Sequence, residues 1–452
     1  MRRHLFLAGT DTDDVSELDE PLAALVALFT LGHRLPVGRA RAALEPVNLE
    51  QLCETGLIAV NGETVTPEYR LRPFAQLLVA GDVDRPEDPG VVSAFTGSSL
   101  KLARLTPRAR VPSMLDVGTG SGVLALLGAR HCDQVTATDV NPRAMTFARF
   151  NADLNGISNL ELLEGSWFGP VAGRRFDLIA CNAPYVISPD QEFTYRDSGL
   201  PGATLLERLT REAAEHLAPG GLAVVLCNWP HGAQEDWDRA PLVAAAATSC
   251  DAVILGSATV DPFDYAVNWN APPASFMAPD ALRHTIARWL DYYRAIGAGA
   301  ITYGAIILRR RTHGTRWVTA LQTHTNVGDH AAEQLTAVLA GNDLLEQTGE
   351  DQALLARRFS LPDGIDISQR FQRRDGRFVA RAAMVRLDGG LGLSAAVDPD
   401  ALDVLFACDG RQTLLEVIER VAERRGVDLE GVTQSAMDAV GELLRHGLVQ
   451  GA

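Results

Sequence analysis

A glycine-rich loop, GTGSG at 118–122, is the first segment whose residue types and spacing suit chemistry. It stands between an apolar strand-like segment and a helix-like one. Glycines at such a turn let backbone N–H groups approach a ligand without interference from side chains. The dinucleotide fingerprint GxGxxG would have its third glycine where this chain has Val123, which disfavours NAD and FAD. No Gly-Lys-Ser or Gly-Lys-Thr follows the loop, so a phosphate-gripping P-loop is excluded.

A second segment, NAPY at 182–185, follows an apolar strand-like run and suits the handling of a planar NH2 group. The lone pair of an amide or aromatic NH2 is conjugated, so the nitrogen is a poor nucleophile until it is oriented. The side-chain oxygen of Asn182 and a backbone carbonyl at Ala183 or Pro184 can accept both hydrogens. Tyr185 offers a face to the planar group and to developing positive charge. Orientation of this kind lowers a barrier by about 7–11 kcal/mol at best. The alternative is an ordinary turn at the end of a strand.

Two aspartates frame the glycine loop. Asp116 stands just before it, and Asp139 ends the next strand-like segment, 23 residues after Asp116. Together with the loop, the pattern LDVGTGSG resembles the class I S-adenosylmethionine-dependent methyltransferases. The resemblance implies that Asp139 accepts hydrogen bonds from both ribose hydroxyls of the cofactor, and that Asp116 and the loop face its amino-acid end. The alternative is a tight turn in another kind of α/β enzyme.

The third strand departs from the pattern of that family. Many of its members place an acidic residue there to bind the adenine amino group, whereas this chain has Gly165, Ser166 and Trp167. Ser166 can still hydrogen-bond, and Trp167 or Phe168 can stack on adenine unless both rings belong to the core. We therefore expect the cofactor to be S-adenosyl-L-methionine, bound by Asp116, Gly118, Thr119, Gly120, Gly122, Asp139, Val140, Ser166, Trp167 and Asn182.

The segment at 182–185 resembles the Asn-Pro-Pro-Tyr motif of methyltransferases that modify planar NH2 nitrogens. The wider run from about 95 to 230, with FDLIACNAPYV at its centre, looks like the release-factor glutamine methyltransferases and the small-domain guanine N2-methyltransferases of ribosomal RNA. Ala183 stands at the usual first proline, a change that keeps the backbone carbonyl but lowers rigidity. The resemblance implies that the catalytic residues are Asn182, Ala183, Pro184 and Tyr185.

A polar segment, ISPDQEFTYRDSGLPG at 187–202, lies between this motif and the next helix-like segment. We expect it to lie over the cofactor as a lid, with Tyr195, Arg196 and Asp197 as substrate contacts. The alternative is a loop packed on the edge of the sheet.

The elements that must position these residues alternate between strands and helices from about 91 to 311. Repeated strand–helix units predict a doubly wound, Rossmann-like α/β sheet of the class I methyltransferase type, with the last strands adding an antiparallel edge. We expect small helical, winged-helix-like domains at both ends. The N-terminal one has a hairpin about Asn61 and Gly62, followed by a linker at 81–90.

The expected divisions of the chain follow from these patterns. The segments LFACDG and TLLEVIE near the C-terminus resemble the helical part of PqqD-like winged helices, which bind leader peptides of ribosomal peptide products. Residues between the central sheet and that unit show no organisation in the sequence. We expect an N-terminal winged-helix-like cap at 1–85, a methyltransferase domain at 86–311, an α/β extension at 312–375 and a C-terminal PqqD-like domain at 376–452.

The charge balance is acidic. The chain of 452 residues has 41 Lys and Arg against 57 Asp and Glu, a net charge of −16. Such a chain is soluble and self-repelling, which argues against one that coats nucleic acid or an anionic membrane. The only dense basic run, Arg309 to Arg311, is interpreted as a solvated face, and the part from Arg381 onward carries 7 basic and 12 acidic residues. The single lysine, Lys101, is given no functional weight.

The six cysteines are spaced widely and irregularly with no CxxC, which predicts neither a disulfide framework nor a zinc site. His324 and His330 are likewise isolated, so no metal is expected. A reducing, cytoplasmic compartment is the simplest interpretation. No apolar run near the N-terminus is long enough for a signal peptide or a membrane span, so no membrane association is expected.

These observations favour a methyltransferase that acts on an amide or amino nitrogen of a protein or peptide, with a glutamine-like acceptor. The same motif suits a nucleobase amino group of ribosomal RNA or DNA, which the charge disfavours. A tailoring enzyme that methylates nitrogen or oxygen of a small-molecule natural product is a third hypothesis, and a cofactor-binding scaffold without turnover is a fourth. The sequence predicts neither the identity of the acceptor nor the oligomeric state.

Overall fold

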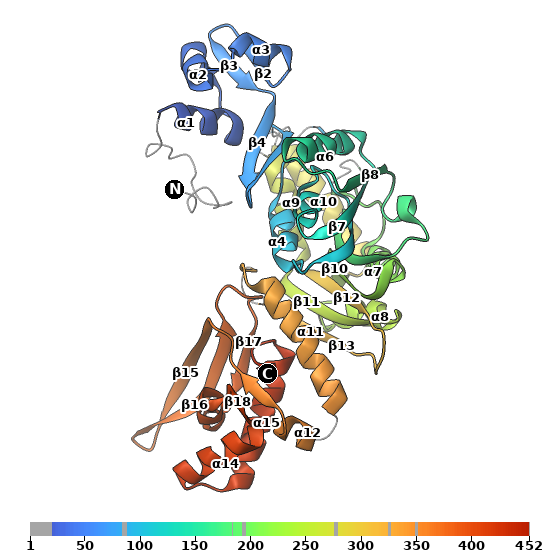
Figure 1. Cartoon of the computed structure of the whole chain (residues 1–452). Coiled ribbons are helices and arrows are strands. Elements are labelled where there is room, and N and C mark those ends of the chain that lie inside the picture. The colour runs from blue at the N-terminus through green and yellow to red at the C-terminus, as the bar shows by residue number, and fades with distance from the viewer. Residues whose placement is uncertain are drawn as a thin grey trace.

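The computed structural model describes residues 20–83, 88–182, 184–191, 196–274, 279–323, 327–348 and 351–451. Its centre is a single mixed sheet of eight strands (Figure 1). In chain order these strands are β6 Val111–Val117, β7 Cys132–Asp139, β8 Leu160–Glu164, β9 Phe176–Cys181, β10 Leu217–His231, β11 Cys250–Val260, β12 Ala300–Arg310 and β13 Val318–Gln322. Across the sheet their order is β13-β11-β12-β10-β9-β6-β7-β8.

Helices cover both faces of this sheet and each face has its own core. The helices of this part are α4 Gly97–Leu105, α5 Val123–Gly128, α6 Pro142–Leu154, α7 Gly202–Glu215, α8 Arg239–Ala246, α9 Pro262–Ala274 and α10 Pro279–Ala295. Leu102 of α4 and Leu126 of α5 pack in one core, while Leu205 of α7 and Ala244 of α8 pack in the other. Neighbouring residues of β6 supply both, since Met114 joins the first core and Leu115 the second. The predicted doubly wound α/β sheet is confirmed.

One strand runs against the others, and it lies inside the sheet rather than at the predicted antiparallel edge. β12 is antiparallel to β10 on one side and to β11 on the other. The edge strand β13 instead runs parallel to β11. The sequence pattern identifies a strand by its apolar run, but it does not show which neighbour the strand will pair with, and the edge prediction was therefore wrong.

The N-terminal unit is helical with a small sheet, as expected. It consists of α1 Glu20–Leu25, a π-helical turn Val26–Thr30, β1 Leu35–Pro36, α2 Val37–Leu44, α3 Leu49–Glu54, β2 Ile58–Asn61 and β3 Thr64–Pro67. The predicted hairpin is present, because Asn61 of β2 pairs with Thr64 of β3 across a turn in which Gly62 has a φ of 64°. Leu28, Ile58 and Val65 form the centre of its own small core.

A hairpin of β4 Tyr69–Phe74 and β5 Leu77–Asp82 joins this unit to the central sheet and was not predicted. The linker expected at 81–90 begins with the end of β5, and residues 84–87 lie outside the described residues. Asp82 is buried, accepts a hydrogen bond from Val92 N at 2.8 Å and pairs with Arg143 of α6. A Cβ on Gly81 would lie 2.1 Å from Ala94 N. The segment that leads into α4 is therefore packed closely against the fold.

The C-terminal unit contains the three predicted helices together with two three-stranded sheets that were not predicted, of orders β18-β14-β19 and β15-β16-β17. Thr413 and Glu416 form the predicted capping box at the start of α14, and Gly447, with a φ of 63°, follows α15. Its elements after β13 are α11 Ala331–Thr348, α12 Asp351–Leu355, β14 Arg358–Ser360, β15 Ile365–Arg374, β16 Arg377–Leu387, β17 Ser394–Val397, a 3-10 turn Pro399–Ala401, α13 Leu402–Ala407, β18 Asp409–Thr413, α14 Leu414–Arg425, α15 Leu429–Arg445 and β19 Gln450–Gly451.

The long hairpin of β15 and β16 straddles the expected division at 375/376. Its two-residue turn is Asp375-Gly376, with φ angles of 47° and 79°. Asp-Gly with two positive φ angles is the turn that matches the twist of paired strands. This dipeptide was therefore the signal in the sequence that could have identified the hairpin.

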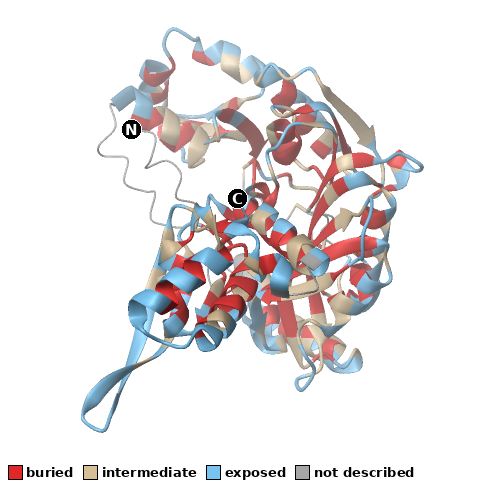
Figure 2. Ribbon diagram, turned by 60° about the horizontal axis from the view of Figure 1, so that its bottom comes forward, coloured by how far each residue is buried: buried red, intermediate tan, exposed pale blue. Residues whose placement is uncertain are grey.

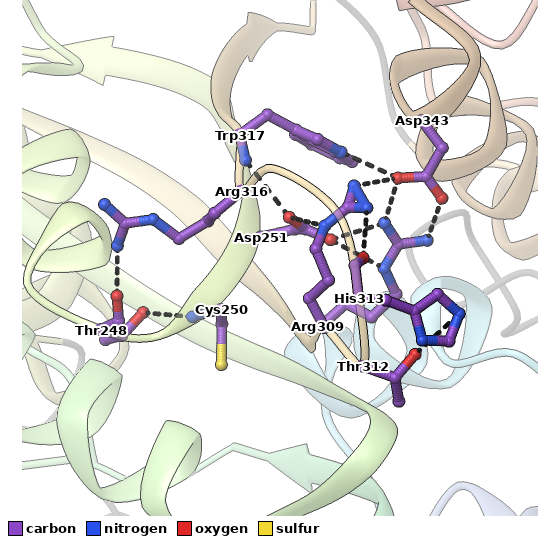
Figure 3. Close-up of polar contacts among 10 residues, drawn as sticks. Thr248, Cys250, Asp251, Arg309, Thr312, His313, Arg316, Trp317 and Asp343 are labelled. Carbon is purple, nitrogen blue, oxygen red and sulfur yellow. Dashed lines mark hydrogen bonds and ion pairs between the residues drawn. The ribbon is translucent and has the colours of Figure 1, made fainter. Parts of the chain in front are cut away.

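An ionic network joins α11 to the central sheet (Figure 3). Asp251 of β11 is fully buried and pairs with Arg309 at 2.6 Å and with Arg311 at 2.9 Å. Both arginines also lie 2.5 Å from Asp343 of α11, which accepts a further hydrogen bond from Trp317 Nε1 at 2.9 Å. The interpretation of Arg309 to Arg311 as a solvated face was wrong for these two arginines, whose side chains are only 20% and 13% exposed. They pair with the buried Asp251 and the half-buried Asp343, because an unpaired buried charge is strongly destabilising.

α11 belongs to two cores at once. Leu335 and Val338 pack with the helices of the central sheet, whereas Leu344 and Leu345 pack against the C-terminal core. A Cβ on Gly341 would lie 2.2 Å from the carbonyl oxygen of Leu444, so α11 and α15 are in backbone contact there. Since β13 also lies in the central sheet, we propose that the methyltransferase domain continues past 311 into α11.

Candidate active site

The glycine loop lies at the carboxyl end of β6, beside β7. The N–H groups of Gly118 and Thr119 both donate to the carbonyl oxygen of Thr138, at 2.9 and 3.0 Å. Gly118, Gly120 and Gly122 have φ angles of 72°, 55° and 88°, a region that only glycine adopts freely. A Cβ on Gly122 would lie 3.1 Å from Ala148 of α6, whereas one on Gly120 would meet nothing within 4 Å. The loop therefore packs tightly against α6 and leaves open space at Gly120.

Asp116 is fully buried beneath this loop, and only one of its two carboxylate oxygens has hydrogen-bond partners among the described residues. Its Oδ2 accepts hydrogen bonds from Thr119 Oγ1 at 2.6 Å and from Ala125 N at 3.1 Å. Its Oδ1 is buried and has no partner among the described residues. Burial raises the pKa of Asp116 to about 7. This oxygen can therefore accept a hydrogen bond from a ligand or bind a positively charged group of a ligand.

Asp139 ends β7 and faces the glycine loop. It accepts hydrogen bonds from Gly120 N and Asn141 N, both at 2.9 Å, and burial raises its pKa. A carboxylate has about four lone-pair positions, so both oxygens can still accept a hydroxyl. Val140, next along the chain, is 54% exposed, and its contact with the cofactor stays a prediction.

The end of β8 lies against Asp139, since Gly165 N donates to the carbonyl oxygen of Asp139 at 2.9 Å. Ser166 is exposed there. Trp167 has a φ of 57°, packs against the core that Phe168 enters, and has the Arg208 guanidinium 4.9 Å from its ring centre. One face of its indole is thus already in contact with a cation. Contact of Ser166 and Trp167 with adenine stays a prediction.

Asn182 follows β9 and meets the start of α4. Its backbone N–H donates to Val117 O at 3.3 Å, and its Nδ2 donates to Ser98 Oγ at 3.3 Å. Its Oδ1 is buried and has no hydrogen-bond partner among the described residues. Ala183 lies outside the described residues. The amide of Asn182 is therefore held by its nitrogen, with its acceptor oxygen free.

Ser98 links two members of the motif. Besides Asn182, it bonds to the hydroxyl of Tyr185, whose pKa is raised by burial and lowered less by this hydrogen bond. Thr96 caps α4 and lies 2.8 Å from Ser98 Oγ. Sequence reasoning missed Ser98, although Thr96-Gly97-Ser98-Ser99 has the composition of a helix N-cap and could have been noticed.

Two tyrosines hold the chain just after Pro184 and Tyr185. Tyr265 of α9 accepts a hydrogen bond from Ile187 N at 3.2 Å, and Tyr293 of α10 donates one to Ile187 O at 2.8 Å. The hydroxyl of Tyr265 also accepts from Asn228 Nδ2 at 2.7 Å. No local motif marks these tyrosines, because they reach the site only through the packing of α9 and α10.

Of the three predicted substrate contacts, Tyr195 lies outside the described residues. Arg196 and Asp197 are buried and paired with each other, with Nε and Oδ1 at 2.8 Å. Arg196 also lies over the ring of Trp289 in α10, with its Cζ 5.3 Å from the ring centre. These contacts hold the segment after the motif onto α10, while direct contact with an acceptor stays a prediction.

Lys101, the only lysine of the chain, lies one turn after Ser98 on α4. Its Nζ donates to Ser257 Oγ at 2.9 Å, and burial lowers its pKa. Ser257 in turn donates to the carbonyl oxygen of Tyr303 at 3.0 Å. The half-buried ammonium group of Lys101 was not predicted in this part of the fold, because a single lysine forms no pattern in the sequence.

Comparison with known proteins identifies the family to which this chain is similar. Residues 87–239 match the model described as Methyltransferase small domain. The release factor glutamine methyltransferase of Salmonella typhimurium is 34% identical over 205 residues, which cover 42% of this chain and 71% of that protein. The chain belongs to the release factor glutamine methyltransferase family. This is a family of class I S-adenosylmethionine-dependent methyltransferases, so the predicted fold and methyltransferase resemblance are confirmed.

Other matches cover smaller parts. The release factor glutamine methyltransferase of Xylella fastidiosa (strain Temecula1) is 38% identical over 130 residues, which cover 26% of this chain and 47% of that protein. The chain thus spans about half the length of that relative. A methyltransferase of Pyrococcus furiosus is 18% identical over 51% of this chain and 89% of that chain, with a TM-score of 0.31. Residues 2–68 and 336–451 match two domains of unknown function, DUF7059 and DUF7782.

The residues at the loop fit the cofactor of this family. Asp116 Oδ1 lacks a donor and suits the α-ammonium group of S-adenosylmethionine. The space at Gly120 and the carboxylate of Asp139 suit its ribose. Among the described residues, no three His, Cys, Asp or Glu side chains are grouped as a metal site, and His324 lies outside them. No helix in the described part of the chain is both long and apolar enough to cross a membrane.

The affinity for S-adenosylmethionine is expected to rise with pH between about 6 and 7.5. The free protein has Asp116 half protonated at about pH 7, and only its ionised form attracts the ammonium group. The ammonium itself loses its proton only near pH 8. Calorimetry across this interval, in buffers of different ionisation enthalpy, measures both the affinity and the release of a proton.

The variant Asp116→Asn is the control for this pH dependence. It keeps the size of the side chain but cannot ionise, so its affinity should be weaker and independent of pH over the same interval. An affinity of the native chain that does not change between pH 6 and 7.5 would contradict the role assigned to Asp116.

Proposed function

We propose that the chain transfers the methyl group of S-adenosylmethionine to the side-chain amide nitrogen of a glutamine in a protein acceptor. The observation that carries this proposal is the buried, unpartnered Oδ1 of Asn182 at the carboxyl edge of the sheet. An acceptor oxygen without a donor suits an NH2 group, and the turn that follows resembles the family's motif. Membership in a family whose relatives carry the name release factor glutamine methyltransferase supports a protein acceptor.

The residues of the motif would act by orientation. Asn182 Oδ1 accepts one hydrogen of the NH2 group, while its Nδ2 is occupied by Ser98 and cannot swing into the same place. A backbone carbonyl at Ala183 or Pro184 accepts the other hydrogen. Tyr185 is held by Ser98 and lies against the planar group. When bound, S-adenosylmethionine supplies an electrophilic methyl group, towards which the nitrogen lone pair is then directed.

No strong base is needed before the transfer, because the nitrogen attacks with its lone pair. The methylated nitrogen carries positive charge and loses a proton afterwards to water. Asn182 and Tyr185 provide the oxygen and the aromatic face that stabilise this charge as it develops. The bond between sulfur and the methyl carbon thus breaks as the bond between nitrogen and that carbon forms. The nitrogen then releases its proton to solvent.

Labelled methyl transfer tests this proposal directly. The chain is incubated with S-adenosylmethionine carrying a tritiated methyl group and with fractionated lysate, and label is expected in protein. Acid hydrolysis of that protein should release volatile labelled methylamine, because the bond formed is an N-methyl amide. Label that enters RNA, or a small molecule, would contradict a protein acceptor, and methanol released by mild base would point to an oxygen.

The cellular setting is part of the same proposal. All six cysteines are free thiols, five of them buried. Thiols that stay reduced are typical of a reducing compartment. We therefore place the reaction in the cytoplasm, with a soluble protein as the partner.

A further inference from the structure

The outer part of the β15–β16 hairpin, residues 370–381, extends away from the body of the molecule, and we call it the arginine ribbon (Figure 2). Ala380 is half-buried and the other residues are exposed. The inner part of the same hairpin is different, since Ile367 and Val385 pack in or against the C-terminal core. The ribbon therefore has two free faces that the fold itself does not use.

The ribbon exposes aromatic rings that a soluble fold normally covers. Phe371 is 55% exposed and Phe378 is 74% exposed. Phe371 pairs with Ala380, and Arg373 pairs with Phe378, so directly opposed residues put both rings and one guanidinium on the same face. Two exposed rings beside a cation form a surface suited to stacking.

The charge of the ribbon is opposite to that of the chain. It contains five arginines and one aspartate, a net of +4, in a chain whose net charge is −16. No ion pair within the described residues involves any of these five, whereas Arg386 at the base of the hairpin pairs with Asp366. The arginines are Arg370, Arg373, Arg374, Arg377 and Arg381.

Two of these arginines face each other directly, because Arg374 of β15 pairs with Arg377 of β16. Like charges opposite one another destabilise a strand pair. A bound anion between or above them would remove that cost. The arrangement is therefore one that an anionic ligand would stabilise.

We propose that the arginine ribbon binds single-stranded nucleic acid. Arginines pair with backbone phosphates, and exposed phenylalanines offer faces on which bases stack regardless of sequence. An acidic peptide would satisfy the arginines but would leave Phe371 and Phe378 without planar partners. The proposal goes beyond methyl transfer and does not rest on it, since the ribbon needs only an extended polyanion with bases.

The earlier argument from net charge does not apply to this surface. Counting from Arg381 onward gave 7 basic and 12 acidic residues, a division that cuts through the hairpin. The strand pairing places Arg374 opposite Arg377. Arg373 lies opposite Phe378 on the other face, so three arginines lie together near the turn of the hairpin. A chain that repels polyanions over most of its surface can bind one where its positive charge is gathered.

Fluorescence anisotropy with the full chain and a labelled 12-nucleotide uridine RNA tests the proposal. The variant Arg373→Ser/Arg374→Ser/Arg377→Ser should bind at least tenfold more weakly. The slope of log affinity against log salt should fall by about 2, since each lost phosphate contact removes roughly 0.7 for single strands. The variant Phe371→Ser/Phe378→Ser should also bind about tenfold more weakly, but with an unchanged salt slope.

A matched control removes three exposed arginines elsewhere. Arg239→Ser/Arg283→Ser/Arg294→Ser lies on α8 and α10, where these side chains are 71–73% exposed, and should bind RNA like the native chain. Equal melting temperatures would show that all variants are folded. A thymidine DNA of the same length that binds as well as the RNA also supports the proposal.

Three outcomes would overturn it. One is an absence of RNA binding by the native chain at 50 mM salt. Another is equal loss of affinity in the control variant. The third is equally tight binding of a poly-glutamate peptide, which would make the ribbon a site for acidic proteins. None of these outcomes bears on labelled methyl transfer, so the two proposals fail separately.

Discussion

Replacing Asn182 with alanine is expected to lower the rate of methyl transfer by roughly 10²- to 10³-fold, the usual effect of removing one preorganised hydrogen-bonding group. The acceptor NH2 would lose the oxygen that fixes one of its hydrogens, and its lone pair would no longer be held in one direction. Ser98 would also lose the amide that it bonds at 3.3 Å. The measurement is the initial rate of labelled methyl transfer, beside the affinity for S-adenosylmethionine by calorimetry.

Cofactor affinity separates a role in orientation from a role in folding. The sequence also placed Asn182 among the cofactor-binding residues, but its buried oxygen is assigned to the acceptor. The affinity for S-adenosylmethionine should therefore stay within about twofold of the native value in Asn182→Ala. The variant Asn182→Asp keeps an acceptor oxygen at the same position and should retain more activity than Asn182→Ala. Full activity in Asn182→Ala would contradict the proposal that Asn182 orients the acceptor NH2 group, and would favour an oxygen acceptor.

Replacing Asp139 with alanine is expected to abolish measurable binding of S-adenosylmethionine. Asp139 is the carboxylate assigned to the two ribose hydroxyls, and hydrogen bonds to a charged group contribute about 1.5–3 kcal/mol each. Loss of both corresponds to a decrease in affinity of roughly 10²- to 10⁴-fold. The N–H of Gly120 would lose its acceptor as well, so the loop would be less well held. Isothermal titration calorimetry measures the change.

A matched control lies on the same strand. Asp133 is near the opposite end of β7, is 56% exposed and pairs only with Arg110 among the salt bridges of the described residues. Asp133→Ala should therefore bind the cofactor like the native chain. An unchanged affinity in Asp139→Ala would show that the cofactor is held elsewhere or is a different one.

The parts of the site that could be predicted from the sequence are those fixed by local geometry. A glycine loop needs its positive φ angles at Gly118, Gly120 and Gly122, and Asp139 must end the next parallel strand to face it. The motif at Asn182 is equally local, because it ends a strand at the same edge of the sheet. Such local requirements appear in the sequence as particular residue types at fixed spacing. The alternation of strand-like and helix-like segments predicts the fold of the central sheet in the same way.

The groups that hold the motif in place could not be predicted in this way. Ser98 of α4, and Tyr265 and Tyr293 of the consecutive helices α9 and α10, lie far from the motif in the sequence and meet it only in the folded chain. Their residue types are ordinary for helices. Nothing in their own neighbourhood distinguishes a tyrosine that bonds to Ile187 from one that fills a core.

The distribution of charge over the folded chain was the property predicted least well from the sequence. A net charge averages over the surface and does not record which side chains meet. Arg309 and Arg311, a conspicuous basic run, are taken up by Asp251 and Asp343 inside the fold. The five arginines of the ribbon lie within residues 370–381, on both sides of the expected division at 375/376, and strand pairing places Arg374 opposite Arg377.

The place of α11 in two cores has a mechanical consequence. Its 18 residues span about 27 Å, with Asp343 bound to arginines of the central sheet and Gly341 in backbone contact with α15. A helix that packs against both units along its length resists bending between them. We therefore expect the C-terminal unit to stay at one distance from the sheet edge that carries the candidate site, rather than to swing towards it.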